Sequence, residues 1–80
     1  MLPQLKKAEY VGDYRIKVNF DDGKEGVINM EEELWGEVFE PLKDQSLFSN
    51  FVVNSELHTI EWPSTGADLA PEFLYEKTIA

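Results

Sequence analysis

The sequence predicts an α+β fold, in which a small, mostly antiparallel sheet of about five strands is packed on one face by two short helices. Three observations support this prediction. Short stretches alternate apolar and polar residues, as half-buried strands do. An acidic run precedes an apolar stripe of helical spacing, and a proline stands where a second helix would begin. The expected order is βββ-α-ββ-α, within a single domain over residues 1–80.

The first three strands are predicted as a meander in which the second loop fixes the register. The first two strands cover residues 6–11 and 14–20. A two-residue turn after the second strand would leave Ile28 facing solvent. A three-residue loop with a bulge at Gly23 instead pairs Ile16 with Ile28 and keeps both on the buried face. We therefore favour the longer loop.

The first helix is predicted after the acidic run Glu31 to Glu33, whose charges suit the positive end of a helix dipole. Pro41 should end this helix near Phe39, and Gly36 weakens its middle. The apolar residues that follow recur at helical spacing and predict one buried stripe: Leu34, Trp35, Val38, Phe39 and Leu42.

A second hairpin and a last helix complete the prediction. The hairpin strands cover residues 51–54 and 57–62, and His58 lies mid-strand on the same face as Trp62. Pro71 suits the first position of a helix, because its missing N–H would have no partner there.

The stretch from Trp62 to Tyr75 has two interpretations. In the first, Trp62 and Tyr75 anchor the core, and the carboxylate of Asp68 caps the free N–H groups of the last helix. In the second, Trp62, Asp68, Tyr75 and His58 line a site for a ligand or a partner. We favour the first, because each residue already has a structural role.

The residue types present argue against several chemistries. The chain has no cysteine and one histidine, so it offers no thiolate site and no transition-metal cluster. No serine stands in a nucleophile elbow. Glu31, Glu32 and Glu33 are consecutive, so in a helix they point in different directions and do not converge on one cation. We expect no catalytic residues, no bound metal and no cofactor.

Charge is distributed unevenly along the chain. The formal net charge is −9; residues 1–29 carry five acids and five bases, and residues 30–80 carry eleven acids and two bases. This surface repels phosphate backbones, so we expect no direct nucleic-acid binding. It would attract a basic protein partner. A basic patch on the first hairpin keeps single-stranded nucleic acid open as a minor alternative: Lys6, Lys7, Arg15 and Lys17.

The same composition also bears on the cellular location of the protein and on its assembly. No apolar run reaches membrane-spanning length, and neither cysteine nor an apolar leader at Met1 to Gln4 is present. We therefore expect a cytoplasmic protein with no membrane contact. A small sheet with a free edge strand would also allow pairing into a homodimer, and this alternative stays open.

The C-terminal stretch resembles the signature of a small bacterial family of unknown function, DUF2442. The resemblance extends upstream to residues 18–23 and 36–48, and Ser64-Thr65 departs from it where one residue is usual. The signature residues matched are Thr59, Ile60, Trp62, Pro63, Gly66, Ala67, Asp68, Leu69, Ala70, Pro71, Leu74 and Tyr75.

The resemblance implies a function that composition alone does not. Members of the similar family are short proteins in a toxin–antitoxin-like setting, or are fused to a helix-turn-helix domain. This chain ends at Ala80, so we expect any contact with DNA to pass through a partner. The preferred hypothesis is a non-enzymatic interaction or regulatory module. The alternative is a small-ligand-binding or weakly catalytic domain near Trp62, Asp68 and Tyr75.

Overall fold

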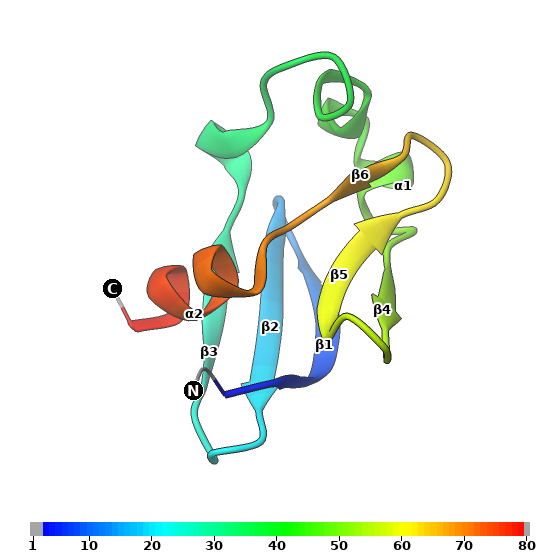
Figure 1. Ribbon diagram of the computed structural model, residues 1–80. Helices are drawn as coiled ribbons and strands as arrows, with labels where there is room; N and C mark the ends of the chain where they lie inside the picture. Colours follow the sequence, from blue (N-terminus) through cyan, green and yellow to red (C-terminus); the bar gives the residue numbers. More distant parts are fainter. Residues whose placement is uncertain (1–2, 80) are drawn as a thin grey trace.

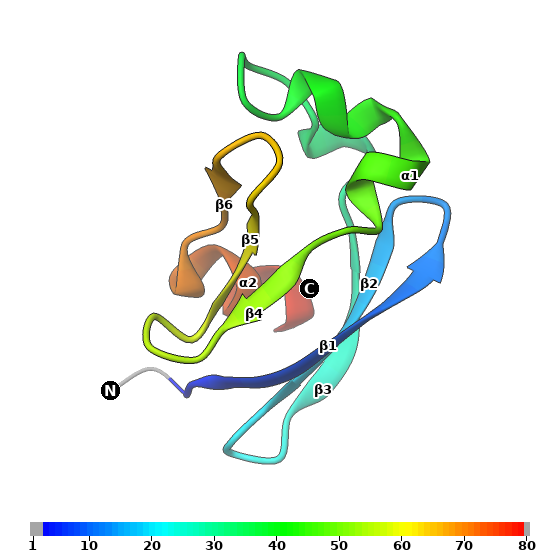
Figure 2. The same cartoon turned by 90° about the vertical axis from the view of Figure 1, so that its right-hand side faces the viewer.

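Two three-stranded antiparallel sheets face each other in the computed structural model, which describes residues 3–79. The first sheet has the order β1 (Leu5–Gly12), β2 (Arg15–Phe20), β3 (Glu25–Asn29). The second has the order β4 (Val52–Asn54), β5 (Thr59–Trp62), β6 (Ala67–Asp68). Figures 1 and 2 show the second sheet and helix α2 (Pro71–Ile79) forming one layer over the first sheet.

The α+β class is confirmed, but the single sheet of about five strands is wrong. Residues 30–51 separate β3 from β4 and cross the end of the first sheet as two 3-10 turns, η1 (Glu31–Glu33) and η2 (Glu40–Lys43), and the short helix α1 (Gln45–Phe48). The second hairpin consequently lies on the face of the first sheet and not at its edge. Ile60 and Trp62 of β5 are completely buried in this position.

The predicted register of the β2–β3 hairpin is confirmed. Ile16 lies opposite Ile28, and the Phe20 N–H donates to the Lys24 carbonyl at 2.8 Å. Gly23 has a φ of +90°, a conformation that a β-carbon would disfavour. Ile28 therefore faces inward and is buried, whereas the two-residue turn would have exposed it.

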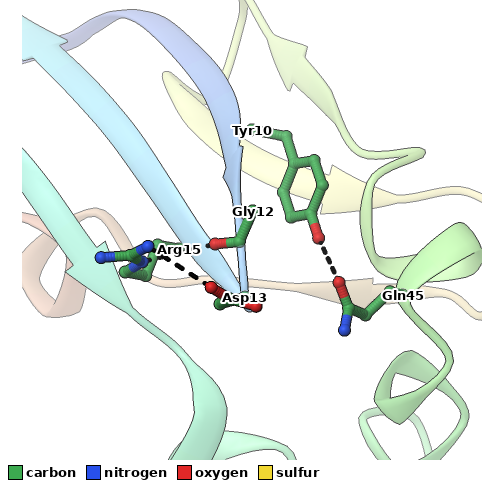
Figure 3. A network of polar contacts seen from close by, with 5 residues as sticks. All are labelled: Tyr10, Gly12, Asp13, Arg15 and Gln45. Carbon is green, nitrogen blue, oxygen red and sulfur yellow. Dashed lines mark hydrogen bonds and ion pairs between the residues drawn. The ribbon is translucent and has the colours of Figure 1, made fainter.

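The other end of the β1–β2 hairpin is tied to α1 (Figure 3). The Tyr10 hydroxyl donates to the Gln45 side-chain oxygen at 2.8 Å, which joins β1 to the first turn of α1. At the hairpin turn, Arg15 pairs with Asp13 at 3.5 Å, and its Nε donates to the Gly12 carbonyl at 3.4 Å. The Tyr10–Gln45 hydrogen bond holds the end of the first sheet against the segment that connects the two sheets, whereas the Arg15 contacts lie within the hairpin turn.

The helix predicted over residues 31–39 is wrong. Only η1 forms, and Gly36 then takes a φ of +93°, which no α-helix accommodates. The chain reverses there, so consecutive apolar residues separate: Leu34 is 2% exposed and Trp35 is 71% exposed. The acidic run and the apolar spacing suit a helix, but the glycine and Pro41 outweigh them.

One core joins the two sheets and is centred on Trp62. Its ring lies 5.6 Å from that of Phe48 and 6.1 Å from that of Phe51, between ring centroids. The indole Nε1 donates to the Phe48 carbonyl at 2.7 Å. Trp62 is therefore a core anchor that also satisfies its one polar atom, as buried tryptophans require.

The last helix is confirmed where Pro71 predicted its start. It packs along β3, and its Thr78 approaches Gly26 of that strand. Within residues 3–79, no helix has the length and the apolar character needed to cross a bilayer.

Candidate functional site

A small apolar groove opens between the segment that follows η1 and the junction of β6 with α2. We call it the Trp35 groove; its volume is about 290 Å³. That size lies at the lower limit for sites that hold a small molecule and suits one or two amino-acid side chains. Its lining residues are Glu33, Trp35, Phe39, Asp68, Leu69, Ala70 and Phe73.

The chain reversal at Gly36 builds one wall of the groove. It turns Leu34 into the core and leaves Trp35 projecting outward with 71% of its surface exposed. Tryptophan is one of the residue types enriched among the side chains that anchor protein interfaces. The reversal therefore leaves exposed a large aromatic side chain that the predicted continuous helix would have buried.

The floor of the groove is rigid because it belongs to the core. Phe39 stacks edge-on against Trp62, with 6.3 Å between ring centroids. Leu69 is fixed on both sides: its N–H donates to the Ile60 carbonyl at 3.0 Å, and its carbonyl accepts a hydrogen bond from the buried Thr59 hydroxyl. A ligand would consequently meet a preformed apolar surface.

The two acidic residues of the groove differ in their surroundings. Glu33 pairs with Lys77 at 2.8 Å, and the Lys77 ammonium lies 5.6 Å from the centroid of the Phe73 ring. Asp68 is exposed and makes neither a salt bridge nor a side-chain hydrogen bond with residues 3–79. The prediction that the Asp68 carboxylate caps the last helix is therefore wrong, and Asp68 is the carboxylate of the groove that has no charged partner among residues 3–79.

The structure does not bring the four predicted site residues together. Asp68 lies at the Trp35 groove, whereas Trp62 is enclosed in the core. The Tyr75 hydroxyl donates to an Asp22 oxygen at 3.0 Å, and its ring stacks edge-on against Phe20. This hydrogen bond, followed by burial, raises the pKa of Tyr75 above its ordinary value of 10.0.

The prediction that His58 lies mid-strand beside Trp62 is wrong. His58 ends the loop that precedes β5 and has a φ of +54°. Asn54 causes the difference, because its side-chain oxygen accepts from the N–H groups of Glu56 and Leu57 at 2.9 and 3.0 Å and closes a turn there. The strand therefore begins only at Thr59.

A family model described as a protein of unknown function (DUF2442) matches residues 5–80. The chain belongs to this family. Its resemblance to DUF2442, inferred from the sequence, is confirmed. No curated protein and no solved structure matches the chain. The family description assigns no activity, so the function must be inferred from the surface of the molecule.

Sequence reasoning missed most of the Trp35 groove. The apolar spacing predicts Trp35 and Phe39 on the buried stripe of a helix, which does not form. The available signal was Gly36, which the sequence places directly after an aromatic residue. A glycine at that point ends the helix and leaves the preceding side chain free to project.

A second concavity, of about 550 Å³, lies on the first sheet and contains part of the predicted basic patch. Lys6, Lys7 and Lys17 line it together with Phe20. Phe20 is buried, so this lining offers no exposed ring on which a base could stack. Across residues 3–79, no three metal-ligating side chains gather at one point.

Proposed function

We propose that this protein is a non-enzymatic interaction domain that binds a basic partner protein through the Trp35 groove. The supporting observation is the combination of an exposed Trp35, a preformed apolar floor and the unpaired carboxylate of Asp68. Aromatic anchors surrounded by charge are typical of the centre of a protein interface.

The charge of the chain supports a basic partner. Residues 30–80, which include the whole groove, carry nine more acids than bases, because eleven acids face two bases. A partner of opposite charge would be drawn to this side over the Debye length, about 10 Å at 0.1 M salt. We further propose that it acts in the cytoplasm, as expected from its composition, and in a bacterial toxin–antitoxin-like or transcription-associated setting, by analogy with the family resemblance described above.

The alternative of a ligand site built on Trp62, Asp68 and Tyr75 has weaker support. Trp62 has no exposed surface, and the Tyr75 hydroxyl is already engaged with Asp22. These two side chains would have to leave their present contacts before they could touch a ligand held by Asp68.

Affinity capture with matched variants tests the proposal. We would immobilise wild-type protein, Trp35→Ala and Leu57→Ala, and apply lysate of the host bacterium at low and high salt. Leu57 is a suitable control, because it is exposed to 58% and does not line the groove. We expect a basic protein that wild type and Leu57→Ala retain, that Trp35→Ala loses, and that high salt releases.

Measurement of the purified pair then decides the result. Trp35→Ala should weaken binding by about thirtyfold or more, as expected for an aromatic interface anchor. Equal affinity of wild type and a folded Trp35→Ala variant would show that the groove is not the binding site.

A further inference from the structure

The free edge of β6 lies beside the Trp35 groove. β6 is the last strand of the second sheet, and within residues 3–79 it pairs only with β5. In Figure 1 its other edge faces the segment that follows η1, and residues of both segments line the groove. A strand edge that carries unpaired main-chain groups is a template for another extended chain.

The register shows which main-chain groups are free. The Leu69 N–H donates to the Ile60 carbonyl, and Asp68 lies opposite Glu61. Hydrogen-bonded and non-hydrogen-bonded pairs alternate along an antiparallel ladder, so the N–H and C=O of Asp68 point away from β5. Neither group has a backbone partner within residues 3–79.

We propose that the segment of the basic partner that the groove recognises is an extended chain that adds to the free edge of β6. Its main chain would donate to the Asp68 carbonyl and accept from the Asp68 N–H. Side chains at every second position would enter the apolar groove between Trp35 and Phe73. A lysine or arginine of the same segment would pair with the Asp68 carboxylate. This inference rests on the proposed function and specifies its mode of recognition.

The free edge of β6 is short, so the side chains of the partner segment must supply most of the binding. β6 contains two residues, and only Asp68 directs its main chain outward. Two main-chain hydrogen bonds contribute little alone, so the apolar side chains and the cation must supply most of the affinity. We therefore expect a segment that alternates apolar and basic residues.

A pair of substitutions at one position isolates the main-chain contribution. Asp68→Ala and Asp68→Pro both remove the carboxylate, but only proline removes the N–H. Proline is tolerated on an edge strand where the N–H faces outward. The probe is a fluorescein-labelled peptide of alternating arginine and leucine with one central phenylalanine, and anisotropy gives its affinity. Asp68→Pro should bind about two- to tenfold more weakly than Asp68→Ala, as one lost hydrogen bond requires.

The peptide itself provides a second test that needs no change to the protein. Two versions carry N-methyl groups on alternate amides, one version for each edge of the extended chain. One of them should bind wild-type protein about two- to tenfold more weakly than the unmodified peptide, because its edge amide can no longer donate. The other should bind unchanged.

Each outcome separates the two proposals. If Trp35→Ala abolishes binding while Asp68→Pro equals Asp68→Ala and neither methylated peptide is weakened, the groove binds its partner but the extended mode is wrong. If Trp35→Ala binds like wild type, the proposed function itself is wrong. If the unmodified probe does not bind wild-type protein, the proposed alternating basic segment is overturned.

Discussion

Asp44 stabilises the segment between the sheets through its charge. It is the N-cap of α1, and one carboxylate oxygen accepts from the Ser46 N–H at 2.9 Å and from the Ser46 hydroxyl at 2.7 Å. The hydrogen bond from the Ser46 hydroxyl is the main cause that lowers the pKa of Asp44 below its ordinary value of 3.8, and the bond from the Ser46 N–H adds to it.

This shift predicts a pH dependence of stability. A carboxyl whose pKa is lower in the folded state contributes stability above its unfolded pKa and loses it as pH falls through the folded pKa. Asp44→Ala should therefore lower the urea midpoint at pH 7, and the difference from wild type should shrink below about pH 3.8. Glu9→Ala controls for general charge effects, because Glu9 is exposed and makes neither an ion pair nor a side-chain hydrogen bond within residues 3–79. A difference that stays constant down to pH 2 would contradict the assignment.

At the scale of elements, α2 and β3 touch at one position where only glycine fits. A β-carbon on Gly26 would lie 2.9 Å from the Thr78 γ-methyl and 3.5 Å from the Thr78 carbonyl. The Thr78 hydroxyl donates to the Leu74 carbonyl at 2.7 Å, so the side chain is held in place. The missing side chain of Gly26 is therefore what allows the close approach.

This contact predicts a coupled pair of substitutions. Gly26→Ala should destabilise the protein by about 1–3 kcal/mol, because the added methyl overpacks the α2–β3 contact. Thr78→Ser removes the obstructing methyl but keeps the hydroxyl, so Gly26→Ala with Thr78→Ser should recover most of the loss. Urea unfolding of the two single variants and the double variant gives the coupling. Additive effects would show that Gly26 is not limited by Thr78.

Elements were predictable from the sequence where the local signals agreed. Alternation and Gly23 together set the β2–β3 register, and Pro71 placed the start of α2. The prediction of a helix over residues 31–39 was wrong because the apolar spacing favours a helix and Gly36 favours its end. The chain turns at Gly36, which adopts a positive φ there. β6 was missed because two residues are too few for a pattern, and its pairing with β5 forms only after the chain has turned.

At the scale of the whole molecule, local sequence patterns could not predict whether the strands form one sheet or two. The second hairpin buries Ile60 and Trp62 in the same core whether it extends the first sheet or covers its face. Which of these two positions the hairpin takes depends on where the segment of residues 30–51 ends relative to the first sheet. The path of that segment follows from several short turns and not from one periodic pattern. The Trp35 groove was unpredictable for the same reason, because its two walls are joined only by this arrangement.

The charge of the whole molecule predicts how salt affects its stability. The net charge is −9, and the three ion pairs found within residues 3–79 engage only Asp13, Glu33 and Glu40 among the acids. Most carboxylates therefore repel one another in the folded state, where they are closer together than in the unfolded chain.

Raising sodium chloride from about 20 to 300 mM should consequently raise the urea midpoint at pH 7, because the Debye length falls from roughly 20 Å to 6 Å. We expect a gain on the order of 1 kcal/mol, comparable to a few exposed ion pairs. Glu32→Lys reduces the charge of the acidic part, and Glu9→Lys makes the same exchange in the balanced part. The salt response should fall more in Glu32→Lys. If the salt response falls equally in both variants, the repulsion depends on total charge and not on the acidic part of the chain. If the stability of the wild-type protein falls as salt is added, the favourable ion pairs contribute more than the repulsion between carboxylates.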